Sequence, residues 1–315
     1  MTTATSTHTS VLPPIDFFLL AAIWGASYLF MRLATEALAP FVLAEVRLLL
    51  GACLLLPLCY RHILPLPIQM WGRIALVSVF NMAGPAMLFS WAAHQIPSGV
   101  NAIAGAMTVV FTSLIGVAVF RERLHWRAAL GILGGLLSVT LLARSKLGDV
   151  TLGWPVLGGV VASLCYGIGL HLAKRLLVGV PAMALAAAAM ICSALMILPF
   201  TLGQWPRQVP PMHATLSTIL LGLLCTGFAY VLYYRLVARI GPARTSAVSY
   251  LIPVFGVTFG ALFLHETVTM AMGLSGLLIL VSIGLCQSGN SPQRAGSAGI
   301  AGPPAPTTQR ADCTR

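Results

Sequence analysis

Long apolar runs make up most of the chain, and polar or basic residues gather in the short breaks between them. A run of about 20 apolar residues is long enough to cross the hydrocarbon core of a membrane as a helix. The apolar residues are continuous and do not alternate with period two, which favours helices over the strands of a barrel. The pattern predicts an all-α integral membrane protein with ten transmembrane helices, at 15–33, 41–60, 74–93, 100–120, 126–143, 152–173, 180–200, 215–234, 246–264 and 270–286.

The composition supports a membrane protein and leaves a polar segment at each end. Hydrophobic residues make up 58% of the chain and charged residues 8%, and the mean hydropathy is +0.92. Soluble domains carry roughly a quarter charged residues, so a soluble fold would lack the polar surface it needs. Residues 1–14 are polar and residues 288–315 are rich in Gly, Pro, Ser, Thr and Ala, which predicts a disordered tail at each end.

The basic residues are distributed as a topology signal. Ten spans place both termini on one side of the membrane, and the positive-inside rule makes the more basic side the cytoplasm. With cytoplasmic termini the inner loops hold Arg61, Arg73, Arg121, Arg123, Arg127, Lys174, Arg175, Arg235, Arg239 and Arg244, and the outer loops hold only Arg144, Lys146 and Arg207. We therefore expect a multi-pass protein of the cytoplasmic membrane. The net charge of +11 forms no stripe with interleaved aromatic residues, so nucleic-acid binding is not expected.

Two hydrophobic runs end in the same pattern, Gly116 to Glu122 and Gly260 to Glu266, and the two glutamates are 144 positions apart. An offset of 144 positions also pairs Phe111 with Phe255, Val110 with Val254 and Ile96 with Ile240. An offset of 142 positions pairs Gly131 with Gly273, Gly134 with Gly276, Trp24 with Tyr166, Gly25 with Gly167 and Arg32 with Lys174. This predicts two five-helix repeats, at 15–143 and 151–287, joined by a loop at 144–150. Because five is odd, the second repeat is inverted in the membrane, as in secondary transporters whose substrate path lies between the halves.

The stretches WGASYLFMRLA in the first helix and PFVLAEVRLLLGA in the second, together with the two Gly-to-Glu helix ends, resemble the EamA family of the drug/metabolite transporter superfamily. The resemblance covers residues 15–287. It implies a ten-helix transporter with inverted repeats, often an exporter of amino acids or other small metabolites. The chain departs from the family pattern at Val109, where the second repeat has Pro253. We expect alternating access with export of a small organic metabolite, or alternatively uptake, and no cofactor or metal.

The resemblance also implies that helices 1, 3, 4, 6, 8 and 9 line a central cavity. Polar and aromatic residues deep in these helices are candidates for the substrate site, since a buried Asn or His needs partners that water or substrate can supply. Interhelical hydrogen bonds and interfacial anchoring are the alternative roles. The candidates are Trp24, Ser27, Tyr28, Asn81, Ser90, Trp91, Asn101, Tyr166, His171, Tyr230 and Tyr250.

Arg47 lies inside the second helix, where a charge costs roughly 2.5–3.5 kcal/mol on insertion scales. It could bind an anion or act in gating, which leans toward a solute with a carboxylate. It could also have a structural role, either in a pair with Glu45 or Glu36 or in hydrogen bonds to helix ends, although Glu45 is two positions away on another helix face. Because the resemblance implies a peripheral second helix, we favour the structural role.

Further polar and helix-breaking residues have two interpretations each. Glu122 and Glu266 could carry protons, but we favour interfacial residues that stop a span and anchor the next turn, with Glu122 cytoplasmic and Glu266 external. His171 could couple transport to protons, or lie at the cytoplasmic mouth. Pro85 and Pro253 interrupt or begin helices and could act as bending points.

Enzyme chemistry is not supported by the motifs. HETVT at His265 lacks the second histidine of a HExxH zinc site, because Thr269 takes its place, and GLSG at 273–276 has no histidine after it to act as a base. A channel or scaffold is a second alternative, and flux that saturates would distinguish a carrier from it. The expected partners are a small-molecule solute and the lipid bilayer, with protons as a candidate coupling ion, and the protein is expected as a monomer or homodimer.

Overall fold

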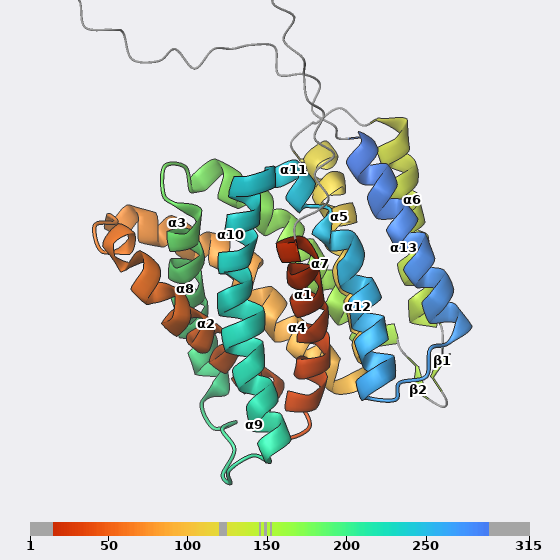
Figure 1. Cartoon of the computed structure of the whole chain (residues 1–315), viewed down its shortest axis with the longest axis horizontal. Helices are drawn as coiled ribbons and strands as arrows, with labels where there is room; N and C mark the ends of the chain where they lie inside the picture. The colour runs from red at the N-terminus through yellow and green to blue at the C-terminus, as the bar shows by residue number, and fades with distance from the viewer. Residues whose placement is uncertain (1–14, 120–124, 145, 148–149, 152, 290–315) are drawn as a thin grey trace, which may run out of the picture.

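The structure, a computed structural model, describes residues 15–119, 125–144, 146–147, 150–151 and 153–289 (Figure 1). In chain order the elements are α1 (Ile15–Ala34), α2 (Pro40–Ile63), α3 (Ile68–Ser78), η1 (Val79–Ala83), α4 (Gly84–Gln95), α5 (Ser98–Ala118), α6 (Trp126–Arg144), β1 (Lys146–Leu147), β2 (Val150–Thr151), α7 (Gly153–Leu176), α8 (Ala182–Thr201), α9 (Met212–Ile219), η2 (Leu220–Phe228), α10 (Ala229–Ile240), α11 (Pro242–Thr245), α12 (Val248–Phe263) and α13 (Met270–Gly289). Glu122 and the predicted tails, apart from residues 288–289 of α13, lie outside the described residues.

The described helices form nine candidate membrane spans and one shorter apolar segment. Within the described residues nine helical segments are long and apolar enough to span, and the tenth, α12, is a shorter apolar helix of 16 residues. α3, η1 and α4 run on as one span, as do α9, η2 and α10. The predicted all-α class of ten helices in two five-helix repeats is confirmed. The loop predicted at 144–150 differs in detail, because β1 and β2 form a short antiparallel hairpin there.

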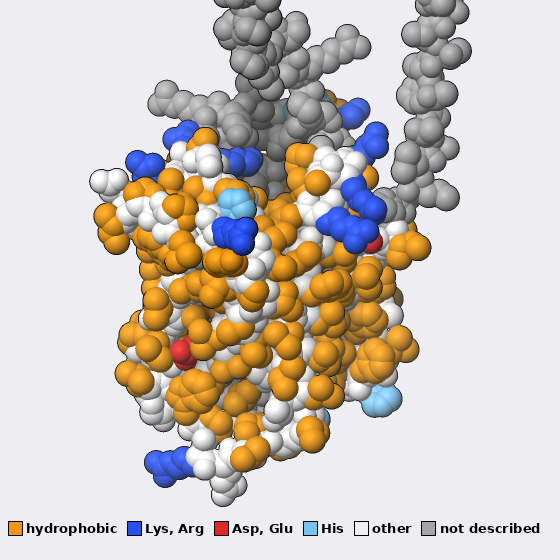
Figure 2. Space-filling model, turned by 60° about the vertical axis from the view of Figure 1, so that its left-hand side comes forward, with side chains coloured by type: hydrophobic (Ala, Val, Ile, Leu, Met, Phe, Trp, Pro, Cys, Tyr) orange, Lys and Arg blue, Asp and Glu red, His pale blue; other side chains and the backbone are white. Residues whose placement is uncertain are grey.

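The two ends of the bundle differ in charge. We call the end where α1 begins and α13 ends the proximal face, and the end where α1 ends and α13 begins the distal face; they are the top and bottom of Figure 1. Figure 2 shows Lys and Arg gathered near the proximal face, above a broad hydrophobic band. Large apolar side chains stay exposed along the spans, among them Leu58, Leu133 and Leu195. Such a band suits contact with lipid chains.

The two repeats interlock through the first helix of each, which packs against the fourth helix of the other. A Cβ added to Gly25 of α1 would lie 3.1 Å from the Gly256 nitrogen of α12. A Cβ added to Gly167 of α7 would lie 3.1 Å from the Thr112 nitrogen of α5. Gly25 and Gly167 are a predicted repeat pair, and Gly256 lies 144 positions after Thr112. The same close approach of two backbones is therefore built twice, and both need a residue without a side chain.

The third span of each repeat contains a π-helical segment at a matching position. η2 includes the residues that lie 144 positions after η1. Pro85 follows η1 and has no N–H group with which to continue the α-helical hydrogen-bond ladder. In η2 the Thr226 hydroxyl donates to the Leu221 carbonyl oxygen at 2.8 Å. π-Helical turns are rare and are frequent at functional sites, so the pair marks the third spans for closer study.

Two outer helix pairs flank the interlocked centre. α2 packs against α8 on one lateral side of the bundle, and α6 packs against α13 on the opposite side. α1, α4, α5, α7 and α12 lie between the two pairs (Figure 1). Leu55, Ile74 and Met190 lie fully buried in the core beside the α2–α8 pair. α6 and α13 pack closely because Gly131 faces the backbone of α13. A Cβ added to Gly131 would lie 2.7 Å from the Ser282 carbonyl oxygen.

Glu266 joins the end of α12 to the start of α5 at the distal face. Its carboxylate accepts hydrogen bonds from the Ser98 N–H at 2.7 Å, the Ser98 hydroxyl at 2.9 Å and the Gly99 N–H at 3.2 Å. The free N–H groups and the positive dipole of a helix N-terminus stabilise a carboxylate. A side chain on Gly260 would overlap this carboxylate. Glu266 was expected to stop its span and anchor the next turn, and the structure adds that it caps a helix of the other repeat.

A methyl group added at either interlocking glycine should destabilise the bundle. Gly25→Ala and Gly167→Ala each force a Cβ against the facing backbone, and overpacking of this kind typically costs about 1–3 kcal/mol. The two contacts are equivalent, so we expect similar decreases in the midpoint of thermal unfolding in detergent. Gly273→Ala is the matched control, because nothing lies within 4 Å of a Cβ there. Equal midpoints for all three variants would contradict the interlocked packing.

Removal of the Glu266 carboxylate should loosen the first turn of α5. Glu266→Ala leaves the Ser98 and Gly99 N–H groups without their side-chain acceptor, and loss of such a cap costs about 0.5–2 kcal/mol. We expect faster amide hydrogen exchange at the start of α5, measured by mass spectrometry, and an intermediate rate for Glu266→Gln. Glu36→Gln, at an exposed carboxylate, is the control. Unchanged exchange in Glu266→Ala would show that these bonds do not hold the helix start.

Candidate functional site

Three aromatic rings meet where the repeats face each other. The Tyr28 ring of α1 lies edge-on to Phe89 of α4, with ring centroids 5.9 Å apart, and Phe89 lies 6.1 Å from Tyr166 of α7. Gly105 of α5 leaves room for the Tyr28 hydroxyl. Tyr28 and Tyr166 are only partly buried although their helices run through the middle of the bundle (Figure 1). We call Tyr28, Phe89 and Tyr166 the ring cluster.

Two buried polar side chains lie next to Phe89, Ser90 directly after it in α4 and Asn101 in α5. Asn101 donates from Nδ2 to the Phe89 carbonyl oxygen at 3.1 Å. Its Oδ1 and the Ser90 hydroxyl oxygen are buried and have no hydrogen-bond partner among the described residues. An unsatisfied buried polar atom costs about 1–3 kcal/mol. These two atoms therefore suit a site where water or a bound molecule supplies the missing hydrogen bond.

More rings continue from the cluster toward α10. Trp24 of α1 lies 5.6 Å from Tyr233, and Tyr230 brings its hydroxyl to 3.8 Å from Met82 Sδ in η1. Both contacts join spans of different repeats. Ser27, which was predicted with them, donates to the Trp24 carbonyl oxygen of its own helix at 2.6 Å. Its hydroxyl is thereby satisfied without a solute.

Asn81 and Trp91 lie where the third span of the first repeat packs on α7. A Cβ on Gly169 would lie 2.8 Å from the Asn81 Cβ, and a Cβ on Gly158 would lie 2.7 Å from the Trp91 ring. Both side chains remain partly accessible. The two glycines thus let α7 approach η1 and α4 closely, which brings Tyr166 near Phe89.

His171, Tyr250 and Pro253 are not brought together with the ring cluster. His171 is buried, and its Nδ1 lies 2.9 Å from the Gly167 carbonyl oxygen one turn earlier, so Nδ1 carries the donated proton. Tyr250 faces α13, where its hydroxyl lies 3.6 Å from a Cβ on Gly284. Pro253 lies inside α12, which stays continuous. Their predicted roles in the cavity, in proton coupling and in bending stay predictions.

Arg47 reaches from α2 toward α1, and neither acid proposed as its partner lies beside it. Its Nη1 is 3.5 Å from Met31 Sδ, and its Nε is buried without a partner in the described part of the chain. Glu45 accepts a hydrogen bond from Thr201 of α8, and Glu36 pairs with a histidine of α9 at 3.4 Å. Two positions along a helix differ by about 200°, so Glu45 faces α8 while Arg47 faces α1. The pairing with Glu45 or Glu36 is therefore wrong, and the structural role that we favoured for Arg47 stays a prediction.

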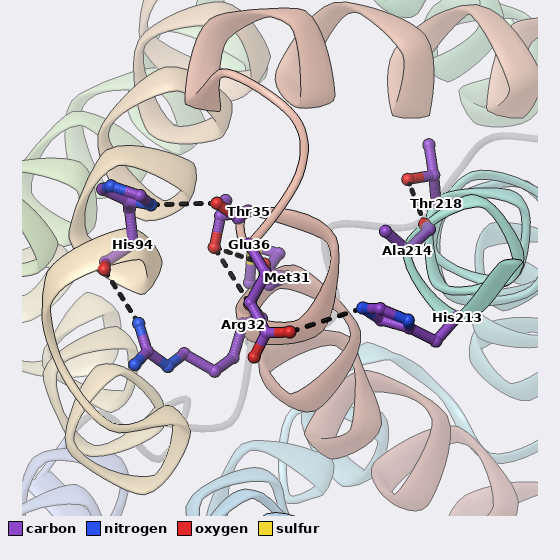
Figure 3. Close-up of polar contacts among 8 residues, drawn as sticks. All are labelled: Met31, Arg32, Thr35, Glu36, His94, His213, Ala214 and Thr218. Carbon is purple, nitrogen blue, oxygen red and sulfur yellow. Dashed lines mark hydrogen bonds and ion pairs between the residues drawn. The ribbon is translucent and has the colours of Figure 1, made fainter. Parts of the chain in front are cut away.

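A polar network joins the distal end of α1 to α4 and α9 (Figure 3). Arg32 Nη1 donates to the carbonyl oxygens of Ala93 at 3.1 Å and His94 at 2.8 Å. His94 in turn lies 2.9 Å from the Thr35 carbonyl oxygen through Nδ1, and Figure 3 also shows the ion pair from Glu36 to α9. The last carbonyls of a helix have no partner within it, so Arg32 satisfies groups that α4 leaves free.

The proximal end of α1 has a simpler set of ion pairs. Asp16 lies 3.3 Å from Arg235 Nε and 3.0 Å from Arg239 Nη1, both on α10. The described ion pairs and side-chain hydrogen bonds therefore hold α1 to α10 at the proximal face, and to α4 and α9 at the distal face.

The sequence did not single out Phe89, Tyr233 or His94. Phe89 lies in an apolar run and looks like any core phenylalanine, and only its contacts with two other helices distinguish it. His94 is the first residue of the HQIPSG turn, and its position at the end of a helix was the one feature of the sequence that could have marked it. Among the described residues no three His, Cys, Asp or Glu side chains gather as a metal site would require.

Comparisons with known proteins bear on the family. The model of the EamA-like transporter family matches twice, at residues 15–144 and 153–286. YedA, an uncharacterized inner membrane transporter of Escherichia coli K12, is 27% identical over 281 residues, which cover 85% of this chain and 89% of YedA. A probable amino-acid metabolite efflux pump of Salmonella typhimurium LT2 is 24% identical over 84% of this chain and 90% of the pump. A probable terminal-alkyne amino-acid exporter of Streptantibioticus cattleyicolor is 28% identical over 66% of this chain and 72% of the exporter.

A solved crystal structure has the same fold. It superposes with a TM-score of 0.62 over 86% of this chain and 94% of its own, and at 18% identity it speaks to the fold alone. The family matches span both repeats, and the relatives are named as membrane transporters. The protein is thus a multi-pass membrane transporter, and the chain belongs to the EamA-like transporter family.

Proposed function

We propose that this transporter exports a small organic metabolite, an amino acid or a related solute, by alternating access. The observation that carries the proposal is the ring cluster between the repeats, with unpartnered polar atoms on Ser90 and Asn101 beside it. Small-molecule sites are mostly apolar and aromatic with a few polar groups. Transporters with inverted repeats bind their substrates near the midplane where the repeats meet.

In this proposal the aromatic faces hold the apolar part of the solute and the free polar atoms orient it. Release through the distal face requires the contacts of Arg32 and His94 with the facing carbonyls to break. Release through the proximal face requires α1 to part from α10, where Asp16 pairs with two arginines. The π-helical segments interrupt the regular ladder of both third spans and would ease their bending.

The distribution of charge supports a cytoplasmic proximal face. Exposed basic residues of the proximal loops include Arg61, Arg73, Lys174, Arg175 and Arg244, and positive loops are retained on the cytoplasmic side. Relatives named as an amino-acid metabolite efflux pump and an amino-acid exporter favour export over uptake. The solute then enters from the proximal face and leaves at the distal face.

Loss of one ring of the cluster should impair export. Amino acids in the medium of expressing and deletion cells are compared first, and the solute that differs is followed in everted vesicles. We expect Tyr166→Ala to lower its transport roughly tenfold, because an aromatic contact of this kind is worth about 1 kcal/mol or more. Leu133→Ala, on the lipid-facing side of α6, is the control that shortens an exposed side chain away from the ring cluster. Equal transport by both variants would exclude the ring cluster as the substrate site.

Single cysteines should reveal which face is external. In a background without reactive native cysteines, Gln204→Cys at the distal face should react with a membrane-impermeant maleimide added to intact cells. His62→Cys at the proximal face should react only after the cells are permeabilised. Both positions are exposed, so access to the reagent differs only by side. The opposite labelling pattern would reverse the proposed orientation and the direction of export through the bundle.

A further inference from the structure

The charge of Arg47 has no carboxylate beside it in the described part of the chain. The described residues contain four carboxylates, and each is engaged elsewhere. They are Asp16 with Arg235 and Arg239, Glu36 with His213, Glu45 with Thr201, and Glu266 with Ser98 and Gly99. An arginine inside a membrane protein normally pairs with an acid or with backbone carbonyls. Arg47 does neither: its one described side-chain contact is the Met31 thioether, a weak acceptor.

The guanidinium lies on the side of α2 that faces the candidate site. Its Nη1 contacts Met31 of α1, one turn along the helix from Tyr28, and Met31 lies in the same buried core as Phe89, against which Tyr28 and Tyr166 also pack. Tyr28 comes from α1 and Tyr166 from α7, so both repeats contribute to this region. Tyr28 and Tyr166 belong to the ring cluster, and neither hydroxyl has a hydrogen-bond partner among the described residues. Arg47 and the ring cluster therefore form one site.

A guanidinium in this setting is suited to one kind of ligand. It offers several N–H donors in a planar fork whose spacing matches the two oxygens of a carboxylate. Its Nε is buried and unpartnered, so part of this fork is free. Phenol hydroxyls can donate to the same oxygens, and an aromatic wall suits the apolar remainder of the molecule. A neutral solute would leave the buried charge uncompensated, which is unfavourable in a low-dielectric interior.

We propose that Arg47 binds the carboxylate of the transported solute, with the Tyr28 and Tyr166 hydroxyls donating to the same group and Phe89 packing against its apolar part. The inference rests on the proposed function, because it names the chemistry recognised at that same site. It makes Arg47 the residue that selects carboxylates over neutral molecules of the same shape. An amino group on the solute meets neutral acceptors, such as Asn101 Oδ1, in place of a carboxylate.

Matched acid and amide probes test the selectivity directly. Phenylacetate with phenylacetamide, and L-phenylalanine with L-phenylalaninamide, differ in the carboxylate and little else in shape. Binding is measured as the ligand-dependent rise in the thermal midpoint of the purified full-length protein in detergent, which requires neither transport nor a known direction. We expect the acids to bind more tightly than the amides. In Arg47→Gln the acids should bind roughly tenfold to a hundredfold more weakly, while amide binding stays unchanged.

Two further variants make the result decisive. Arg73→Gln removes an exposed arginine of the same repeat and should keep the acid preference. Arg47→Lys keeps the charge but not the fork, and should keep part of the preference. An undiminished acid preference in Arg47→Gln, or equal binding of acids and amides by the wild type, would overturn the proposal. Failure of both Arg47 variants to fold would overturn it as well, by assigning Arg47 a structural role.

The same measurements separate this inference from the proposed function. A wild-type protein that transports solute but binds acids and amides equally would remove the role of Arg47 and leave the transporter intact. A protein with the acid preference but no saturable transport in vesicles would remove the carrier function and leave the binding site. Loss of the acid preference only in Arg47→Gln, together with saturable transport by the wild type, is the expected outcome.

Discussion

The close approach of the first helix of each repeat to the fourth helix of the other is the constraint on which the rest of the structure depends. At Gly25 and Gly167 two helix backbones come so near that a single methyl group has no room. Because each contact crosses between the repeats, neither five-helix unit is packed without the other. α1 and α7 consequently run through the centre, where their tyrosines at 28 and 166 both reach the phenylalanine at 89. The ring cluster is a direct result of the interlocked packing.

The interior that this packing creates is incompletely satisfied. Buried polar atoms in folded proteins nearly always have hydrogen-bond partners, yet the Ser90 hydroxyl, Asn101 Oδ1 and Arg47 Nε have none among the described residues. A purely structural core would favour apolar residues at such positions. A site that binds and releases a solute must keep some hydrogen-bonding capacity free, because a permanently paired group cannot be offered to a ligand. In the proposed function the free atoms of Ser90, Asn101 and Arg47 share this explanation with the ring cluster, whereas the unpartnered hydroxyl of Ser275 lies on α13, outside it.

The contacts that would alternate are individually weak. The Glu36–His213 pair is half exposed on both sides, and exposed ion pairs contribute about 0–1 kcal/mol. Arg32 and His94 bond to backbone carbonyl oxygens, and water can donate to the same oxygens once the distal face opens. Contacts of this strength hold one conformation without trapping it. The glycine contacts between repeats are close and apolar in character, and they suit the parts that move as rigid bodies.

The sequence alone determined the membrane class, the ten spans, the two repeats and the family. These follow from local signals: continuous apolar runs, the distribution of arginine and lysine, and residue pairs such as Gly25 with Gly167 that recur in fixed register. The candidate site was only partly foreseen. Tyr28, Tyr166, Asn101 and Ser90 were among the expected residues, whereas Phe89 was not, since an apolar residue in an apolar run carries no signal of its own.

Only the tertiary structure decided where charges and rings point. The sequence named Arg47 and Tyr250 as candidates but not their neighbours: the rotation of each helix brings Arg47 to Met31 of α1 and Tyr250 to Gly284 of α13. Glu266 could be recognised as half of a repeated motif, but its hydrogen bonds to Ser98 and Gly99 join segments far apart in the chain. Hydrophobicity along a chain fixes which segments enter the membrane. It carries little information on helix rotation, because the lipid and the protein interior are both apolar. A transmembrane helix between them has no polar face that shows which side turns inward.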